Sequence, residues 1–362
     1  MITKVAIVGV GLIGSSLGLA LQDLERIEEV VGIDKDSNHL NQALDIGAIN
    51  EQAELKQGVK DADLIVLATP VETIKKLLEK LKPHVKKGAI ITDVGSTKSN
   101  IVAKAENLVE QQHFIGGHPM TGSEVVGPAG ADKYLFENAF YILTRTEKTN
   151  QKSLSELERI FSANGAQVLI LSPEYHDKIV AVTSHLPHAL AVSLVASLME
   201  YGGDDDLFTS LIAGGFRDTT RVAAGDSTMW RDIFLCNQEF VLDSIEVLQD
   251  NLAKLKQLIS QDSKQELFTY LEEVREYRLK LPMKKKGLLP SNYELLITLK
   301  DEPNAIGKMA SKLGDKGINI QDIEVLKVRD QGGTLRTSFS HEEEQLEACE
   351  ILEQDGYKVI IK

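Results

Sequence analysis

Three glycines with the spacing G-x-G-x-x-G stand between an apolar strand pattern and a helical pattern near the start of the chain: Gly9, Gly11 and Gly14. An acidic residue, Asp34, follows at the end of the next strand pattern. In dinucleotide-binding βαβ units the first glycine allows a tight turn, the second lets a pyrophosphate approach the backbone, and the third lets helix pack on strand. The pattern therefore predicts a Rossmann-type parallel sheet with a dinucleotide at this turn.

The residues around this turn predict which dinucleotide binds. The first helical turn, with Leu12 and Ile13, presents backbone amides and a positive dipole to the phosphates. The Asp34 carboxylate is expected to accept hydrogen bonds from the adenosine ribose and to repel a 2′-phosphate, which favours NAD over NADP. Residues at the ends of later strands are expected to lie beside the nicotinamide half: Thr69, Pro70 and Asp93.

Apolar patterning divides the chain into domains. Up to residue 171 short apolar runs alternate with helical segments, which predicts a βαβ series and one mostly parallel sheet, the NAD-binding Rossmann domain over 1–171. The predicted strands are 4–8, 30–33, 64–68, 89–93, 114–115, 139–143 and 168–171. Helical periodicity between them is clear at 74–81 and 154–161.

From 172 to 281 helical patterns replace the strands, including 187–199 and 238–259. Ser263 and Glu266 have capping-box spacing for a further helix that ends near 279. The apolar stripe of 238–259 suits either an intramolecular core or a dimer interface, so we predict an all-α substrate and dimerisation domain over 172–281. Two prolines, a glycine and a lysine run predict a linker over 282–292.

The last 70 residues, 293–362, restart as a compact βαββαβ pattern, which is typical of ferredoxin-like domains. Strands are predicted at 293–299, 318–327, 334–340 and 357–361, with helices at 305–316 and 342–354. Gly332 and Gly333 are interpreted as a hairpin turn.

Composition bounds the partners. The net charge of −14 argues against nucleic-acid and anionic-membrane partners, and an anionic substrate would need a local cationic pocket. The candidate pocket is an arginine cluster: Arg217, Arg221 and Arg231. The two cysteines form neither a disulfide framework nor a zinc pattern. With no signal-peptide pattern and no apolar run of membrane-spanning length, we expect a cytoplasmic protein.

A glycine-framed histidine is the candidate catalytic residue. His118 stands in Gly116-Gly117-His118-Pro119, on the predicted loop side of the sheet. An imidazole beside a nicotinamide can accept the proton of an alcohol whose hydride is removed. His185 and His188 have a one-turn spacing suited to a metal, but Pro187 stands between them and no clear third ligand exists beyond His176. We therefore predict no metal site.

Five motifs in order resemble the prephenate/arogenate dehydrogenase family of tyrosine biosynthesis: 95–98 (GSTK), 116–124 (GGHPMTGSE), 184–188 (SHLPH), 214–221 (GGFRDTTR) and 229–232 (MWRD). The resemblance covers residues 1 to about 280, and the C-terminal unit resembles an ACT regulatory domain. It implies NAD-dependent oxidative decarboxylation of prephenate to 4-hydroxyphenylpyruvate. Removal of hydride from C4 while C1 loses carbon dioxide aromatises the ring, so the reaction requires no metal.

The resemblance also implies residue roles. His118 would draw the proton of the C4 hydroxyl, Ser96 would hydrogen-bond that hydroxyl or the histidine, and Arg221 would clamp a carboxylate. Trp230 matches a residue that reaches the partner subunit's site, which implies a homodimer through the helical domain. Further positions match the substrate pocket: Ser123, Glu124, Ser184, His188 and Asp218.

ACT domains often bind an amino acid at the turn from the first strand into the first helix, here 301–307, which suggests tyrosine as an effector. Asn304 replaces the family's usual glycine and tolerates left-handed geometry. A purely dimerising domain is the alternative. For the activity, arogenate is the nearest alternative substrate. A 3-hydroxyacid dehydrogenase relying on Lys178 and a non-catalytic sensor of NAD and amino acids are more distant alternatives.

Overall fold

The fold is described from a computed structural model of the chain. The described residues are 2–108, 111–122, 125–202, 205–261, 263–281, 293–300, 302–329 and 332–361. The predicted linker 282–292 lies outside them. The chain divides into two compact units, Met1–Leu281 and Pro282–Lys362.

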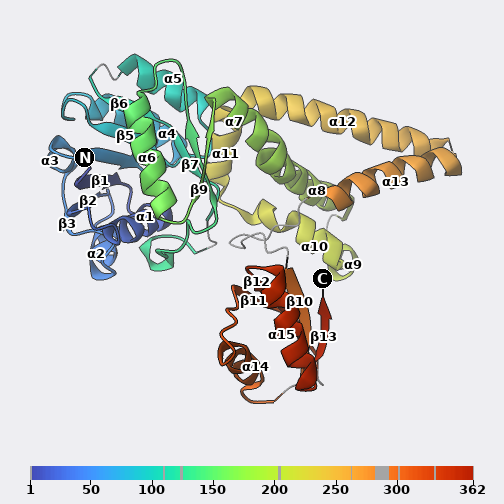
Figure 1. The fold of residues 1–362 in the computed structure, drawn as a ribbon. Helices are drawn as coiled ribbons and strands as arrows, with labels where there is room; N and C mark the ends of the chain where they lie inside the picture. The colour runs from blue at the N-terminus through green and yellow to red at the C-terminus, as the bar shows by residue number, and fades with distance from the viewer. Residues whose placement is uncertain are drawn as a thin grey trace. The chain divides into compact units, whose positions relative to one another are not determined.

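The first unit begins with a parallel sheet of six described strands in the order β3-β2-β1-β4-β5-β6 (Figure 1). The strands are β1 (Lys4–Val8), β2 (Glu29–Ile33), β3 (Glu51–Gln52), β4 (Leu64–Leu67), β5 (Ile90–Asp93) and β6 (His113–Ile115). All except the two-residue β3 were predicted. The strand order reverses between β1 and β4, and the carboxyl ends of strands at such a switch point are where open α/β sheets bind ligands.

Helices cover both faces of this sheet because its central strands are apolar on both sides. One face packs against α1 (Leu12–Gln22), α2 (Ser37–Asp45) and α6 (Gln151–Ala163). The other packs against α3 (Leu55–Lys60), α4 (Val71–Leu81) and α5 (Ser99–Leu108). Strand β1 shows the division, since Val5 and Ile7 belong to the first core and Ala6 and Val8 to the second.

A second sheet corrects the prediction of one continuous sheet. In the described chain it consists of β7 (Gly117–Pro119), β8 (Phe140–Thr144) and β9 (Gln167–Leu171), with β7 antiparallel and β9 parallel to β8. His118 pairs with Ile142, so it lies on a strand and not on the predicted loop. A short 3-10 helix, η1 (Pro128–Gly130), precedes β8.

One continuous helix opens the helical part of the unit. It consists of α7 (Pro173–Val180), the π-helical turn η2 (Ala181–His185) and α8 (Leu186–Gly202). The helix predicted to begin at Pro187 therefore begins earlier, at Pro173, and the motif 184–188 lies inside it. Pro187 is tolerated because it follows the π-helical turn, where the Leu186 N–H already bonds five residues back to the Ala181 oxygen.

The helices that follow are α9 (Asp206–Ser210), α10 (Gly214–Thr220), the 3-10 helix η3 (Arg221–Ala224), α11 (Ser227–Cys236), α12 (Gln238–Ser260) and α13 (Lys264–Lys280). The last two form a long hairpin (Figure 1). Ser263 caps α13 in position, but its side chain makes no capping hydrogen bond, so the predicted capping box is not formed. The hairpin exposes large apolar side chains: Leu242, Val247, Leu252, Ile259, Phe268, Leu271, Val274, Tyr277 and Leu279.

The helix Pro173–Gly202 is long and apolar enough to cross a membrane by length and composition, with a mean hydropathy of 1.6 over an 18-residue window. This corrects the expectation that no apolar run reaches that length. Only 28% of the window is buried inside the chain. The exposed remainder, like the hairpin, is the kind of surface that protein interfaces cover.

The second unit has the predicted βαββαβ order: β10 (Tyr293–Leu299), α14 (Ala305–Gly314), β11 (Asp322–Arg329), β12 (Gly332–Phe339), α15 (Glu342–Gln354) and β13 (Lys358–Ile361). The described strands form one antiparallel sheet in the order β11-β12-β10-β13, which is ferredoxin-like. Both helices pack their apolar faces on it. Gly332 and Gly333 pair with Arg329 and Val328, so they open β12 and do not form the predicted turn.

Candidate active site

The turn between β1 and α1 has the geometry of a phosphate-binding turn. Gly9 has a φ of 97°, and a Cβ there would overlap the Ala68 oxygen. A Cβ on Gly14 would overlap the Gly9 oxygen, so α1 can approach the strand this closely only with glycine. Gly11 by contrast faces open space and caps α1 without a side-chain partner. The first amides of α1 are thereby available to an anion.

Asp34 lies at the same turn. Its Oδ2 accepts the N–H of Val10 at 2.9 Å, and its Oδ1 accepts the N–H of Asp36 at 3.0 Å. These bonds hold the carboxylate beside the glycines, and each oxygen retains a lone pair for a ribose hydroxyl. The residues present therefore fit a dinucleotide with an unphosphorylated ribose.

Thr69 and Pro70 follow β4, and the Thr69 side chain lies next to Gly9. The Thr69 hydroxyl is buried without a hydrogen-bond partner among the described residues, so it can still bond to a ligand. Asp93 is different. Its fully buried carboxylate bonds to Lys98 Nζ and to the N–H groups of Gly95 and Gly117. The Asp93 carboxylate therefore holds the protein backbone, and the expectation that Asp93 lies beside the nicotinamide half stays a prediction.

Asp93 and Lys98 together hold the peptide that precedes His118. Lys98 Nζ donates to the Gly117 carbonyl oxygen at 2.8 Å, and the Gly117 N–H donates to Asp93 Oδ1 at 3.2 Å. A Cβ on Gly117 would lie 2.5 Å from the Asp93 backbone oxygen, which explains the glycine. Because Asp93 ends β5, His118 stands at the carboxyl edge of the parallel sheet.

His118 is partly exposed and belongs to a chain of hydrogen bonds. Its Nδ1 lies 2.8 Å from His176 Nε2, and His176 Nδ1 lies 2.8 Å from Asp177 Oδ1. Both partners come from α7 and are only 1% exposed. In the sequence, His176 was interpreted only as a possible metal ligand and Asp177 was not identified, because two adjacent polar residues near the start of a helix resemble ordinary surface positions.

The surroundings keep His118 neutral. Burial lowers the pKa of His118 well below 6.5, and the charge of Lys98 lowers it further. Burial alone would raise the pKa of Asp177, but its hydrogen bonds with His176 and Ser99 outweigh this and lower it. A neutral imidazole that is linked through His176 to an ionised carboxylate can therefore act as a proton acceptor.

His188, on α8, is buried and stacks on Trp230, on α11, with ring centroids 3.5 Å apart and planes at 8°. Its Nδ1 has no hydrogen-bond partner among the described residues, which suits a ligand contact. His185 is buried and contacts the protein itself, with its Nδ1 3.1 Å from Asn237 Nδ2.

The other predicted residues lie on several elements. Ser96 is partly exposed after β5, and no hydrogen bond joins it to His118 in the described chain. Ser184 is exposed in the π-helical turn and Asp218 on α10, while Arg221 is exposed on η3, which packs against α8. Ser123 and Glu124 lie outside the described residues.

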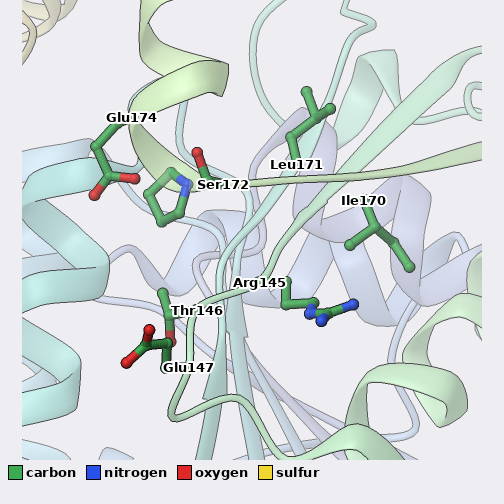
Figure 2. Close-up of a pocket in the computed structure, with 8 residues that line it drawn as sticks. Arg145, Thr146, Glu147, Ile170, Leu171, Ser172 and Glu174 are labelled. Carbon is green, nitrogen blue, oxygen red and sulfur yellow. The ribbon is translucent and has the colours of Figure 1, made fainter.

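An ion pair within the arginine cluster and a surface hollow were also compared with the predicted site. In the predicted arginine cluster, Arg231 pairs with its neighbour Asp232 at 2.6 Å. A surface hollow of about 530 Å³ lies between the β8–α6 connection, the end of β9 and the start of α7, and Figure 2 shows its side chains. Its described lining contains none of the predicted site residues, so we do not assign it to the active site: Arg145, Thr146, Glu147, Ile170, Leu171, Ser172, Pro173 and Glu174.

Comparisons with known proteins agree with this geometry. A family model described as the nucleotide-binding domain of prephenate dehydrogenase matches residues 17–170, and one described as its dimerization domain matches 172–273. The chain is 36% identical to prephenate dehydrogenase of Bacillus subtilis, over 96% of this chain and 95% of that protein. It is 37% identical to the prephenate dehydrogenase of Lactococcus lactis, over 97% and 98%.

Solved structures give the same result. Prephenate dehydrogenase from A. aeolicus, in complex with hydroxyphenyl propionate and NAD+, superposes with a TM-score of 0.73 at 36% identity, over 78% of this chain and 99% of that one. Synechocystis arogenate dehydrogenase superposes with a TM-score of 0.69 at 33% identity, over 77% and 99%. The chain therefore belongs to the prephenate dehydrogenase family of NAD-dependent oxidoreductases.

Proposed function

We propose that the chain catalyses the oxidative decarboxylation of prephenate to 4-hydroxyphenylpyruvate, with His118 as the base. The observation that carries the proposal is a neutral, partly exposed imidazole, anchored through Nδ1 at 2.8 Å, at the carboxyl edge of a sheet with a dinucleotide turn. NAD, when bound, supplies the hydride acceptor. The loss of carbon dioxide aromatises the ring and provides the driving force, so the chain itself needs to supply only positioning and proton transfer.

The remaining side chains bind and orient the substrate. Ser96 follows the same strand end as Asp93, where it can hydrogen-bond the substrate hydroxyl. Arg221 supplies a guanidinium that clamps a carboxylate and offsets the negative charge of the chain. The other proposed pocket residues are Ser123, Glu124, Ser184, His188, Asp218 and Trp230.

The test is steady-state NADH formation by the full-length chain. His118→Asn should lower kcat at least about a hundredfold while KM for prephenate stays near the wild-type value, because only the proton acceptor is lost. Arg221→Ala should instead mainly raise KM. Unchanged turnover in His118→Asn would exclude the base assignment, and an unchanged KM in Arg221→Ala would exclude the carboxylate contact.

Arogenate is the second candidate substrate, because a solved arogenate dehydrogenase is also similar to the chain. The two substrates differ in the side chain, which carries an amino group in arogenate and a keto group in prephenate. Competition between the two in one assay, with NAD and then NADP, decides both preferences. A higher kcat/KM for arogenate would reassign the substrate without changing the role of His118.

We also propose a homodimer through the helical domain. The matched dimerization model and the exposed apolar side chains of α12 and α13 support it. The unit that ends at Leu281, and family models that meet near 171, support the proposed boundaries of this domain. Leu271→Glu on the hairpin should shift the sedimentation coefficient toward the monomer, whereas Glu273→Gln should not. A monomeric wild-type chain would refute the proposal.

We further propose that the second unit is an ACT domain that binds tyrosine. A pocket of about 430 Å³ lies at the turn from β10 into α14, where Asn304 adopts the expected left-handed conformation with a φ of 66°. Its lining is Leu299, Lys300, Glu302, Asn304, Ala305, Ile306, Gly307, Val325, Gly333 and Leu335. Tyrosine should inhibit the wild type, and Ile306→Trp, which fills the pocket, should abolish inhibition. If calorimetry detects no binding of tyrosine to the wild type, the alternative role of a purely dimerising domain is favoured.

A further inference from the structure

We propose that His176 and Asp177 form a positioning relay that holds His118 in one tautomer, with the proton on Nδ1 and the lone pair of Nε2 directed to the substrate. The proposal rests on the proposed function, in which His118 is the base. It goes further by naming the residues that orient this base and select its protonation pattern.

The direction of each hydrogen bond follows from the carboxylate. An ionised carboxylate only accepts hydrogen bonds, so the contact between Asp177 Oδ1 and His176 Nδ1 requires a proton on that nitrogen. A neutral His176 then has its lone pair on Nε2. The 2.8 Å contact from this Nε2 to His118 Nδ1 in turn requires a proton on His118 Nδ1. The remaining nitrogen of His118 is left as an acceptor.

Asp177 is itself held by two elements. Its Oδ1 and Oδ2 accept the backbone N–H groups of Lys98 and Ser99, at 2.7 and 2.8 Å, where α5 begins. Its carbonyl oxygen accepts Asn237 Nδ2 at 2.9 Å, just before α12. With every oxygen occupied and the side chain 1% exposed, the carboxylate has one available orientation toward His176.

The relay closes a ring of contacts around the base. The side chain of Lys98 bonds to the carbonyl of Gly117, the residue before His118, while the backbone of Lys98 bonds to Asp177. His118 is thus fixed from both sides, through its own peptide and through its ring. Such double support restricts both the position and the rotation of the imidazole, which is what a proton acceptor in a reaction needs.

The proton transfer itself balances simply. The substrate O–H bond breaks and an N–H bond forms at His118 Nε2, so the ring becomes an imidazolium. Its Nδ1–H remains donated to His176, and this bond strengthens because its donor is now charged. Asp177 stays ionised behind His176 and stabilises the charge, as the aspartate does behind the histidine of a serine-protease triad. His176 and Asp177 need not exchange protons with the substrate.

The kinetic test compares two substitutions with opposite properties. His176→Phe keeps a ring of similar volume but has no acceptor for His118 Nδ1. His176→Gln loses the ring but can place an amide oxygen near the former Nε2. A relay predicts that kcat falls at least about tenfold in the Phe variant, is partly restored in the Gln variant, and that both keep KM within about twofold. If His176 served in packing alone, kcat would instead be higher in the Phe variant than in the Gln variant.

The spectroscopic test reads the tautomer directly, without turnover. In ¹⁵N-histidine-labelled full-length protein, the His118 signals, identified by their loss in His118→Asn, should show a protonated Nδ1 and an unprotonated Nε2. His176→Phe should shift His118 toward a mixture of tautomers, and His113→Gln, a matched change on β6, should leave it unchanged. A proton on His118 Nε2 in the wild type would overturn the relay.

The two tests separate the relay from the proposed function. Absence of NADH formation from prephenate by the wild type would refute the function, yet the tautomer measurement would still decide the relay. Wild-type turnover with an unchanged kcat in His176→Phe would refute the relay and leave the function intact.

Discussion

The ammonium group of Lys98 donates a 2.8 Å hydrogen bond to the carbonyl oxygen of Gly117, one residue before His118. Its ion-pair partner, Asp93, accepts the N–H of the same glycine. One fully buried ion pair thus holds both polar groups of a single residue. Burial lowers the pKa of Lys98, and the charge of Asp93 opposes this shift. Since desolvation offsets much of the attraction in such pairs, we assign this one chiefly to positioning.

Removing one partner of this pair should destabilise the protein strongly. Lys98→Met leaves the Asp93 carboxylate buried without a counter-charge, which costs about 3–5 kcal/mol. Urea unfolding measures the loss. Lys104→Met is the control, because the Lys104–Glu79 pair is partly exposed on the surface and its removal should change the free energy of unfolding by less than about 1 kcal/mol. Equal effects of the two substitutions would contradict the assignment.

Gly117→Ala tests whether the position of His118 depends on this close packing. A Cβ would stand 2.5 Å from the Asp93 backbone oxygen and 3.2 Å from the Tyr141 ring, so the strand must move. We expect kcat to fall at least about tenfold, since small displacements of a catalytic group cost up to about a hundredfold. Gly314→Ala, where a Cβ meets nothing within 4 Å, should leave kcat unchanged. Full activity of Gly117→Ala would show that the position of His118 does not depend on the close packing at Gly117.

The parallel sheet and the C-terminal unit could be predicted because the apolar pattern of each strand is visible in its own sequence. Strands β1 and β10 coincide with the predicted 4–8 and 293–299. In the second sheet, β8 and β9 were predicted at 139–143 and 168–171, but β7 could not be predicted in the same way. Gly117–Pro119 has no apolar alternation, and its strand conformation comes from pairing with Tyr141–Leu143 of β8. The surroundings of the candidate base were therefore less predictable than the fold.

The helical part shows why single residues mislead. Proline is common at the first position of a helix, so Pro187 suggested the start of a helix, yet the π-helical turn before it lets one helix run from Pro173 to Gly202. The contact between His118 and His176 joins positions 58 residues apart, and no local pattern marks it. Motifs could identify His118 as the candidate base, but its hydrogen-bond partners required the tertiary structure.

The pH dependence of turnover should reflect the environment of His118. Burial, followed by the charge of Lys98, lowers its pKa well below 6.5, so the ring stays unprotonated and active as the pH falls through 6.5. We expect kcat/KM to remain on its plateau at pH 6.5 and to fall only at lower pH. Samples returned to pH 7.5 control for acid unfolding. A half-maximal value at or above pH 6.5 would show that the base is not His118 in this environment.

Asp63 should make the protein lose stability in acid. Partial burial alone would raise the pKa of Asp63, but the hydrogen bond from Lys86 and those from the backbone of Thr3 and Lys4 outweigh it and lower the pKa from 3.8 to about 2. The stabilisation is therefore complete above about pH 4 and is lost as the pH falls through 3.8 toward 2. The shift corresponds to about 2 kcal/mol, about half of it lost by pH 3.

Urea unfolding of Asp63→Asn between pH 5 and pH 3 tests this linkage. The substitution removes the titrating group, so the variant should start about 2 kcal/mol less stable at pH 5 and should lose about 1 kcal/mol less than the wild type on reaching pH 3. Asp61→Asn, at an exposed neighbouring position, should follow the wild-type pH dependence. Parallel curves for the wild type and Asp63→Asn would mean that the network at the start of β1, through Lys86, Thr3 and Lys4, does not hold an ionised carboxylate.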